Sequence, residues 1–393
     1  MESAPTAGEN IAVLRKTRGM GQTKLARLSG LSLSYLSKLE TGQRPVTPPV
    51  AAAVSQALHV TPARIFGQPF MGPVEQSDLL NELRTTVRRH TLPREDVPPT
   101  AELSQALFKA ATLRADTRYL ELLRILPKLL GQSTAMAITA GGDATAWGQV
   151  ADAYGCAYAV AHRLGHSDLA DMIVARQAWA AQQTWNPDAE AAAAWNEAGT
   201  YQSAGQYEDG LAIIERAISR YESAGGGSTP ARSAILGSLH LRGVVLASRH
   251  KDSGATSDHL TRAKTFAGAI EQDVVLHNLT FGQGNTALYE LAAHIELGQL
   301  DDATSMSGPL MAAPPSWLKP NRIGRLYIDV ARAKLMKKDH QGAEDALKGA
   351  FRVAPQMAAV HPMAREVLRV LFVLHQRTKP DLMSMAKKTG LTQ

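Results

Sequence analysis

Polar and basic side chains alternate with a regular apolar pattern in the segment Gly21–Gly42. Leu25, Ala26, Leu36 and Leu39 have the spacing of buried positions in two short helices that are joined by a tight turn. The hydroxyl, amide and amine groups between them would then lie on the outer face, where they can exchange hydrogen bonds with a partner. A helix-turn-helix presents such a face to the major groove of DNA. The pattern therefore predicts sequence-specific DNA binding.

The positive charge of the chain is concentrated around this segment. The whole sequence of 393 residues has 42 Lys and Arg against 36 Asp and Glu, a net charge of +6. Residues 1–70 carry eight basic and three acidic residues, whereas the remaining 323 residues carry 34 basic and 33 acidic ones. Attraction to phosphate requires a local excess of this kind. A basic surface alone is usually only solvated, so it is the coincidence with the helix-turn-helix pattern that favours DNA.

The composition predicts an all-α protein in which residues 1–70 form the first domain. Ala and Leu dominate, β-branched runs are sparse, and helix start and stop signals recur. We expect five helices in the first domain: one capped by Asn10 and ending near Arg18, Gln22–Leu28, Leu33–Thr41 with Ser32 as its cap, one opened by Pro48 or Pro49, and one opened by Thr61 and Pro62.

Residues 9–67 resemble the XRE family, the Cro and lambda-repressor type of helix-turn-helix. The resemblance rests on Leu14-Arg15 in the first helix, on GQTKLA, and on SGLSLSYLSKLETGQRPVTPP. It implies an ion pair between Arg15 and Glu40 that fixes the orientation of the helices. Gly21 departs from the family, which usually has Ser or Thr there, but Gly is a tolerated N-cap.

The same resemblance implies which residues meet DNA. The exposed face of the recognition helix would reach base edges, with Leu33 suited to a thymine methyl group and Lys38 to guanine O6 and N7. Residues at its margins would meet phosphate or sugar, which sets position without carrying sequence information. The full expected set is Gln22, Thr23, Leu33, Ser34, Tyr35, Ser37, Lys38, Thr41, Gln43 and Arg44.

Residues 71–131 read as a helical connector. A helix is expected over Val74–His90, and amphipathic helices over Glu102–Arg114 and Arg118–Leu130. Pro93, Pro98 and Pro99 lie in a charged loop that is either a hinge or an ordinary connection between helices.

Residues 132–393 repeat helix pairs with tetratricopeptide-like spacing. The units are 191–224, 284–317, 324–357 and a weaker 151–184, with a hairpin at 231–266 whose loop His250–Ser257 is long and a capping helix at Pro362–Gln376. The phrases RIGRLYIDVARA and APQMAAVHPMAREVLRVL are similar to the sensor half of actinobacterial XRE regulators. The resemblance implies a superhelix that serves dimerisation, or that senses a small-molecule or peptide effector. Large or charged candidates for its groove are Trp147, Asn285, Tyr289, Arg322 and Arg325.

Other chemistry has little support in the sequence. His162 and His166 have i, i+4 spacing but no ligand partner at a fixed distance along the chain, and Cys156 is the single cysteine. No Gly-x-Ser-x-Gly or His-Glu-x-x-His motif is present, so we expect no enzyme, no cofactor and no metal. No apolar run reaches the roughly 18 residues of a membrane span, and the first residues lack the pattern of a signal peptide.

Together these features predict a cytoplasmic transcription regulator that binds a palindromic operator as a homodimer. The alternative is an adaptor whose helical array binds a partner protein.

Overall fold

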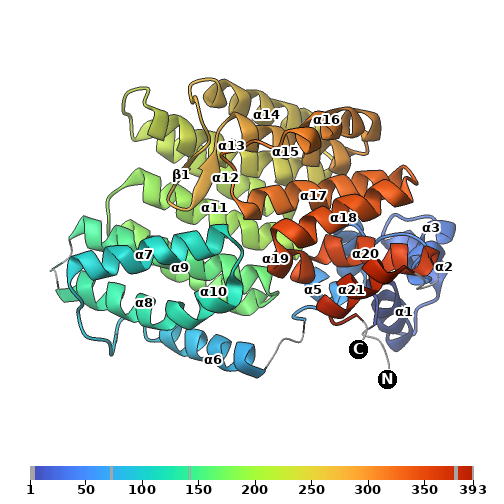
Figure 1. Ribbon diagram of the computed structural model, residues 1–393, viewed down its shortest axis with the longest axis horizontal. Coiled ribbons are helices and arrows are strands. Elements are labelled where there is room, and N and C mark those ends of the chain that lie inside the picture. Colours follow the sequence, from blue (N-terminus) through green and yellow to red (C-terminus); the bar gives the residue numbers. More distant parts are fainter. Residues whose placement is uncertain (1–4, 71–73, 140, 142, 376–378, 392–393) are drawn as a thin grey trace.

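The computed structural model describes residues 5–70, 74–139, 141, 143–375 and 379–391. The chain is all-α apart from one short β-hairpin, and Figure 1 shows helix pairs following one another around an arc. Residues 5–70, which we call the reader, lie at the lower right of that view and close the arc. Among the described residues, no helix is long and apolar enough to cross a membrane.

The reader contains the five expected helices. They are α1 (Ala7–Thr17), α2 (Gln22–Leu28), α3 (Leu33–Glu40), α4 (Pro48–Ala57) and α5 (Pro62–Phe66). The caps of the later helices follow the sequence signals: the Ser32 hydroxyl accepts from the Tyr35 amide at 3.2 Å, and Pro residues open α4 and α5.

The expected start of α1 was wrong. The N-cap is Thr6, whose hydroxyl accepts from the Glu9 amide while the Glu9 carboxylate accepts from the Thr6 amide. This reciprocal capping box satisfies two amides that the first turn leaves free, and it outweighs the single cap that Asn10 could offer. The Asn10 side chain instead donates to the Ile65 carbonyl at 3.0 Å and so ties α1 to α5.

Three helices lead from the reader into the array: α6 (Val74–Arg88), α7 (Thr100–Ala115) and α8 (Tyr119–Thr139). The third was expected to end near Leu130, but it continues for more than two further turns and carries Pro127 inside it. The predicted limit between connector and array, at residues 131–132, therefore falls within one continuous helix.

The array consists of antiparallel helix pairs. They are α9 (Ala144–Arg163) with α10 (Ser167–Gln182), α11 (Pro187–Ala204) with α12 (Tyr207–Ser223), α13 (Pro230–His250) with α14 (Ser253–Ala267), α15 (Gln283–Leu297) with α16 (Leu300–Ala312), and α17 (Pro320–Met336) with α18 (His340–Val353). The long loop expected at 250–257 is absent from this described segment, because Lys251 adopts a left-handed conformation and Asp252 caps α14 at once.

The β-hairpin interrupts the array between α14 and α15. Strands β1 (Val274–Leu276) and β2 (Leu279–Phe281) pair in antiparallel register, and both tip residues, His277 and Asn278, have positive φ. The tip reaches back to α9, where His277 Nδ1 lies 3.0 Å from an Asp152 carboxylate oxygen and Asn278 donates to the Asp152 carbonyl at 3.0 Å. The hairpin thus joins two distant parts of the arc.

The chain ends in α19 (Pro355–Val360), α20 (Pro362–Leu374) and α21 (Pro380–Lys388). The helix expected at Pro362–Gln376 corresponds to α20, although Gln376 lies outside the described residues, and α21 was not expected. Buried apolar side chains of the reader and of the array belong to one continuous cluster that includes Leu39, Ile65 and Leu368. The reader is therefore packed against the array.

Candidate nucleic-acid interface and interdomain pocket

Helix α3 has one buried and one open face. Leu36 and Leu39 are fully buried in the reader core. Leu33 is 48% exposed, and Ser34 and Lys38 are exposed beside it. An exposed leucine next to polar hydrogen-bonding groups is the arrangement that can touch a thymine methyl group and neighbouring base edges.

The ten residues expected to meet DNA divide by exposure. Exposed members are Thr23, Leu33, Ser34, Lys38, Thr41, Gln43 and Arg44, and half-buried ones are Gln22, Tyr35 and Ser37. The Thr41 hydroxyl already donates to the Ser37 carbonyl at 3.0 Å, and burial raises the pKa of Tyr35 against the effect of the nearby Arg44. Leu33, Ser34 and Lys38 are left as the most open group on α3.

A buried polar network fixes α3 to α1 and α2. Arg15 donates from Nε and Nη2 to the two carboxylate oxygens of Glu40, at 2.7 and 2.9 Å, and from Nη1 to the Met20 carbonyl at 2.8 Å. Gln22 donates to the same Glu40 carboxylate at 2.8 Å. The side chains of Arg15 and Glu40 are only 9% and 6% exposed.

The electrostatics of this network are balanced. Burial by itself raises the pKa of Glu40, but hydrogen bonds from Arg15 and Gln22 and the charge of Arg15 lower it below its ordinary value. A two-pronged guanidinium–carboxylate pair has a fixed geometry, so it orients the helices that carry it. Gln22 is therefore held by Glu40 inside the reader.

The basic residues of the reader face solvent. Arg15 is buried, and the other seven are exposed: Lys16, Arg18, Lys24, Arg27, Lys38, Arg44 and Arg64. This surface has the charge that a phosphate backbone attracts.

The array holds the reader without covering the open face of α3. Buried Glu366 of α20 accepts from the Val46 amide at 3.2 Å and from Arg369 at 3.0 Å, and Arg369 also donates to the Pro5 carbonyl at 3.0 Å. Elsewhere Ala52 of α4 packs so closely on Gly205 that a Cβ there would collide with it. Gly205 also has a φ of 78°, which suits glycine.

A pocket of about 610 Å³ lies between reader and array. The reader contributes Pro62 and Phe66, and the array contributes apolar side chains such as Val174 together with three arginines. The three arginines are Arg163, Arg249 and Arg325. This volume is in the range that small-molecule sites occupy.

The structure brings together only some of the residues expected in the groove. Arg325 lines the pocket, and Arg322 lies over the ring of Tyr289 with its guanidinium carbon 5.8 Å from the ring centroid. Trp147 instead packs edge-on against Trp179 at 4.8 Å between ring centroids. Asn285 is buried and donates to the Thr280 carbonyl at 2.6 Å, so it supports the hairpin.

Sequence reasoning missed Arg163, Arg249 and His361 in this pocket. Arg163 ends α9, Arg249 lies in the last turn of α13, and His361 caps α20, so only the curvature of the array brings them together. A signal was present in the two arginines, because each interrupts a nearly apolar helical run, AYAVAHR and GVVLASR. Charged residues are rarely buried without a partner or a function.

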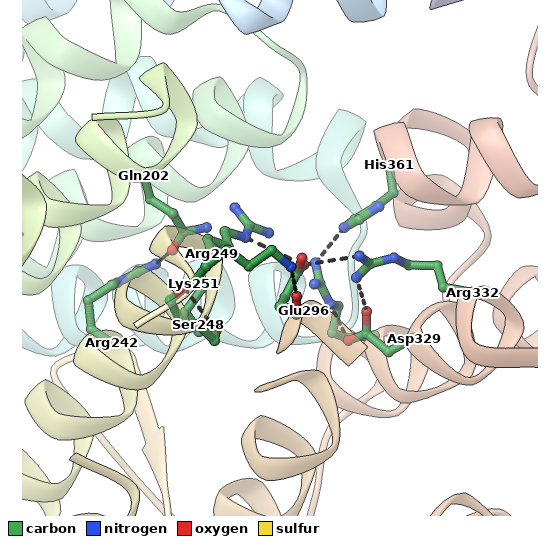
Figure 2. A network of polar contacts seen from close by, with 11 residues as sticks. Gln202, Arg242, Ser248, Arg249, Lys251, Glu296, Asp329, Arg332 and His361 are labelled. Atoms are coloured by element: carbon green, nitrogen blue, oxygen red, sulfur yellow. Dashed lines mark hydrogen bonds and ion pairs between the residues drawn. The ribbon is translucent and has the colours of Figure 1, made fainter. Parts of the chain in front are cut away.

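Arginines and two carboxylates form a network beside the pocket, which Figure 2 shows. Arg332 donates to Asp329 and Glu296, both at 3.0 Å, and Arg325 donates to the other oxygen of Asp329 at 2.7 Å. Arg249 lies 3.6 Å from Glu296. Two carboxylates thus serve three guanidinium groups.

The other side chains considered for chemistry, those of His162, His166 and Cys156, lie in surroundings that suit a structural role. His162 Nε2 lies 2.6 Å from the Ser203 hydroxyl, and burial lowers its pKa to about 3, whereas His166 precedes α10 at the helix start. Burial raises the pKa of Cys156 to about 11, which suppresses thiolate reactivity. Within the described ranges, no group of three or more His, Cys, Asp or Glu side chains could hold a metal ion.

Comparison with known proteins identifies the class of the first domain. Residues 7–65 match the family described as "Helix-turn-helix domain". Together with the α2–turn–α3 geometry, this match identifies the reader as a DNA-binding helix-turn-helix domain.

Whole-chain comparisons add little to this class. No curated protein matches the chain. Among solved structures, PlcR of Bacillus thuringiensis, in complex with the peptide PapR7 and DNA, aligns with 90% of this chain and 97% of its own at 14% identity. Its TM-score of 0.31 is too low to establish a shared fold.

Proposed function

We propose that this protein is a transcription regulator of the XRE type that recognises a specific DNA sequence through α3. The observation that carries the proposal is the open face of Leu33, Ser34 and Lys38 on a helix whose orientation is fixed from beneath by Arg15 and Glu40. A rigid scaffold with an exposed recognition face is what direct readout of bases requires.

The regulator acts as a homodimer on a palindromic operator. One small reader buries too little surface for high specificity, and two readers on half-sites about 34–36 Å apart double the contact. In such a dimer the tetratricopeptide-like array forms the contact between the two subunits, and its pocket binds an effector. A ligand that prefers one arrangement of the readers would change DNA affinity by that preference.

The remaining expected contacts divide by their place around α3. Lys38 and Ser34 read base edges, while Thr23, Gln43 and Arg44 meet phosphate. Gln22, Tyr35, Ser37 and Thr41 make secondary contacts, because the structure partly buries or already hydrogen-bonds them.

Selection of bound sequences from random and genomic duplex DNA, followed by titration, tests this function. The wild-type protein should enrich an inverted repeat and bind it far more tightly than scrambled duplex. Lys38→Ala should weaken specific binding by about 1–3 kcal/mol and relax one base position. Lys128→Ala, an exposed lysine of α8 far from the reader in sequence, is the matched control and should leave binding unchanged.

Two results would count against the proposal. Enrichment of no sequence by the wild-type protein would remove the regulator and favour the adaptor. Equal loss by Lys38→Ala on specific and scrambled duplex would leave Lys38 as a phosphate contact, with no base reading.

A further inference from the structure

The pocket and the helices beside it contain more arginine than buried carboxylate: Arg163 lines the pocket, and Arg242 and Arg322 lie beside it. Among the described residues, no Asp or Glu oxygen lies within ion-pair distance of Arg163, Arg242 or Arg322. Arg242 is only 7% exposed, and it is held by the Gln202 amide oxygen at 2.6 Å and by the face of Trp195. Both of these partners are uncharged.

The buried arginines also have donors without acceptors. The Nε atoms of Arg242, Arg249 and Arg322 are buried and make no hydrogen bond. The two buried carboxylates nearby, Glu296 and Asp329, already accept from Arg332, and Asp329 accepts from Arg325 as well. Both buried carboxylates are therefore already engaged by arginines.

His361 shows the same excess of donors at the pocket wall. The Met363 amide donates to its Nδ1 at 3.2 Å, while Arg325 Nη1 lies 2.7 Å from its Nε2. Burial and the surrounding arginines lower the pKa of His361 far below its ordinary value, so the ring is neutral and can accept at one nitrogen only. One of the two donors lacks an acceptor in this arrangement.

Acidic residues that line the pocket do not repair the imbalance. Asp171 is exposed, and Glu197 is half-buried on α11. Neither forms an ion pair with an arginine in the described structure. Burying an unpaired cation costs several kcal/mol, which is recovered when an anion supplies the missing acceptors.

The pocket is also lined by apolar side chains, and these belong to both domains. Pro62 and Phe66 of the reader face the same space as Ala170, Val174 and Met363 of the array. A ligand that fits both the arginines and these apolar side chains has a charged head and an apolar body.

We propose that the interdomain pocket binds a small organic acid whose carboxylate or phosphate head pairs with Arg163 and Arg325, and whose apolar body lies between Phe66 and Val174. Because Phe66 belongs to the reader whereas Arg163, Arg325 and Val174 belong to the array, the bound acid bridges the two domains and stabilises the docked arrangement. The consequence for DNA affinity rests on the function proposed above, whereas the binding site does not.

Calorimetric titration of the full-length protein in the absence of DNA tests the site. Octyl phosphate and octanoate are the probes, and 1-octanol and inorganic phosphate are the controls that carry only the body or only the head. We expect saturable one-to-one binding of at least one amphiphilic anion, tighter than either control by about tenfold. The preference between the two anions distinguishes a phosphate head from a carboxylate head.

Variants locate the binding. Arg163→Gln should weaken the binding of the preferred anion by at least about tenfold, since it removes a charge-assisted hydrogen bond. Arg163→Lys keeps the positive charge but lacks the planar guanidinium group, so its affinity for the anion should lie between those of the wild type and Arg163→Gln. Arg216→Gln, an exposed arginine of α12, should bind as the wild type does. Thermal melts of each variant without ligand verify that it is folded.

Clear outcomes overturn the inference. Failure of both anions to bind the folded wild type below about 1 mM, or full affinity in folded Arg163→Gln, would remove the site.

Titration with the selected operator tests the regulatory consequence separately. A shift in DNA affinity on adding the preferred anion to wild type, absent in Arg163→Gln, supports the bridge between domains. Tight anion binding with unchanged DNA affinity would keep the site and refute its regulatory role. A protein that binds the anion but no DNA would refute the proposed function alone.

Discussion

The reader and the pocket side of the array both bury arginine, and they balance its charge differently. In the reader, Arg15 meets the carboxylate of Glu40 through two hydrogen bonds, and its third donor group meets a backbone carbonyl. In the array, Arg249, Arg325 and Arg332 pair with two buried carboxylates, Glu296 and Asp329. Three further guanidinium groups lie nearby without a carboxylate partner among the described residues: Arg163, Arg242 and Arg322.

The difference separates a structural network from a binding site. A network whose donors and acceptors match holds helices in a fixed orientation and gains nothing from a ligand. A network with surplus buried donors is stabilised by whatever supplies acceptors. The matched network of the reader suits a scaffold, and the unmatched arginines near the pocket suit the anion site that we propose.

The largest expected effect comes from breaking the balanced pair. Glu40→Gln leaves the charge of Arg15 buried without a carboxylate, so the reader should lose about 4 kcal/mol of stability. Urea denaturation of the full chain measures the loss, and hydrogen exchange of α1 and α3 amides locates it. Glu121→Gln removes an exposed partner of Arg118 and should cost less than about 0.5 kcal/mol. Equal effects of the two changes would contradict the assigned role of Glu40.

The second prediction compares two arginines of the array. Arg332→Gln removes the donor shared by Asp329 and Glu296 and should destabilise the protein by about 3 kcal/mol. Arg163→Gln removes a cation that no carboxylate neutralises, so it should leave the unfolding free energy unchanged or raise it by up to about 3 kcal/mol. Thermal and urea unfolding without ligand measure both. A large loss in Arg163→Gln would show that Arg163 is a structural residue.

The third prediction concerns the close contact between α1 and α3 in the reader. A Cβ at Gly8 would overlap the carbonyl oxygen of Leu39, so Gly8→Ala should push α1 from α3 and cost about 1–3 kcal/mol. Gly148→Ala, in helix α9 with open space around the added atom, should be neutral or stabilise by about 0.5 kcal/mol. Urea midpoints measure both, and operator binding should weaken only in Gly8→Ala.

The smallest effect concerns pH. The pKa of Glu40 is lowered in the folded protein, so the stability that its ionised form contributes is complete above the ordinary pKa of a glutamate and is lost as pH falls through the lowered value. The difference in unfolding free energy between wild type and Glu40→Gln should therefore shrink as pH decreases from about 5 to about 3. A difference that stays constant over this range would mean that Glu40 does not titrate with unfolding.

Local signals predicted the reader well and the array less well. Ser32, Gly42, the Pro48-Pro49 pair that opens α4 and Pro62 at the start of α5 act through neighbouring backbone atoms, so sequence alone located those helices. The capping box of Thr6 and Glu9 is equally local and was overlooked.

The pocket could not be predicted in the same way. Arg163, Arg249 and Arg325 meet only because helices far apart in sequence curve toward one space, which the periodicity of each helix does not encode. The hairpin at 274–281 was missed for a related reason. Its three-residue strands are too short for a clear alternating pattern, and its tip residues, His277 and Asn278, are held by contacts with Asp152 that span more than a hundred residues.

That hairpin constrains how the molecule can move. An array of stacked helix pairs can ordinarily extend and contract along its length, since each pair contacts only its neighbours. Here His277 and Asn278 contact α9 and so link the later helix pairs to the first one. Extending the array would break these polar contacts. We therefore expect large displacements mainly at the contact between residues 5–70 and the array.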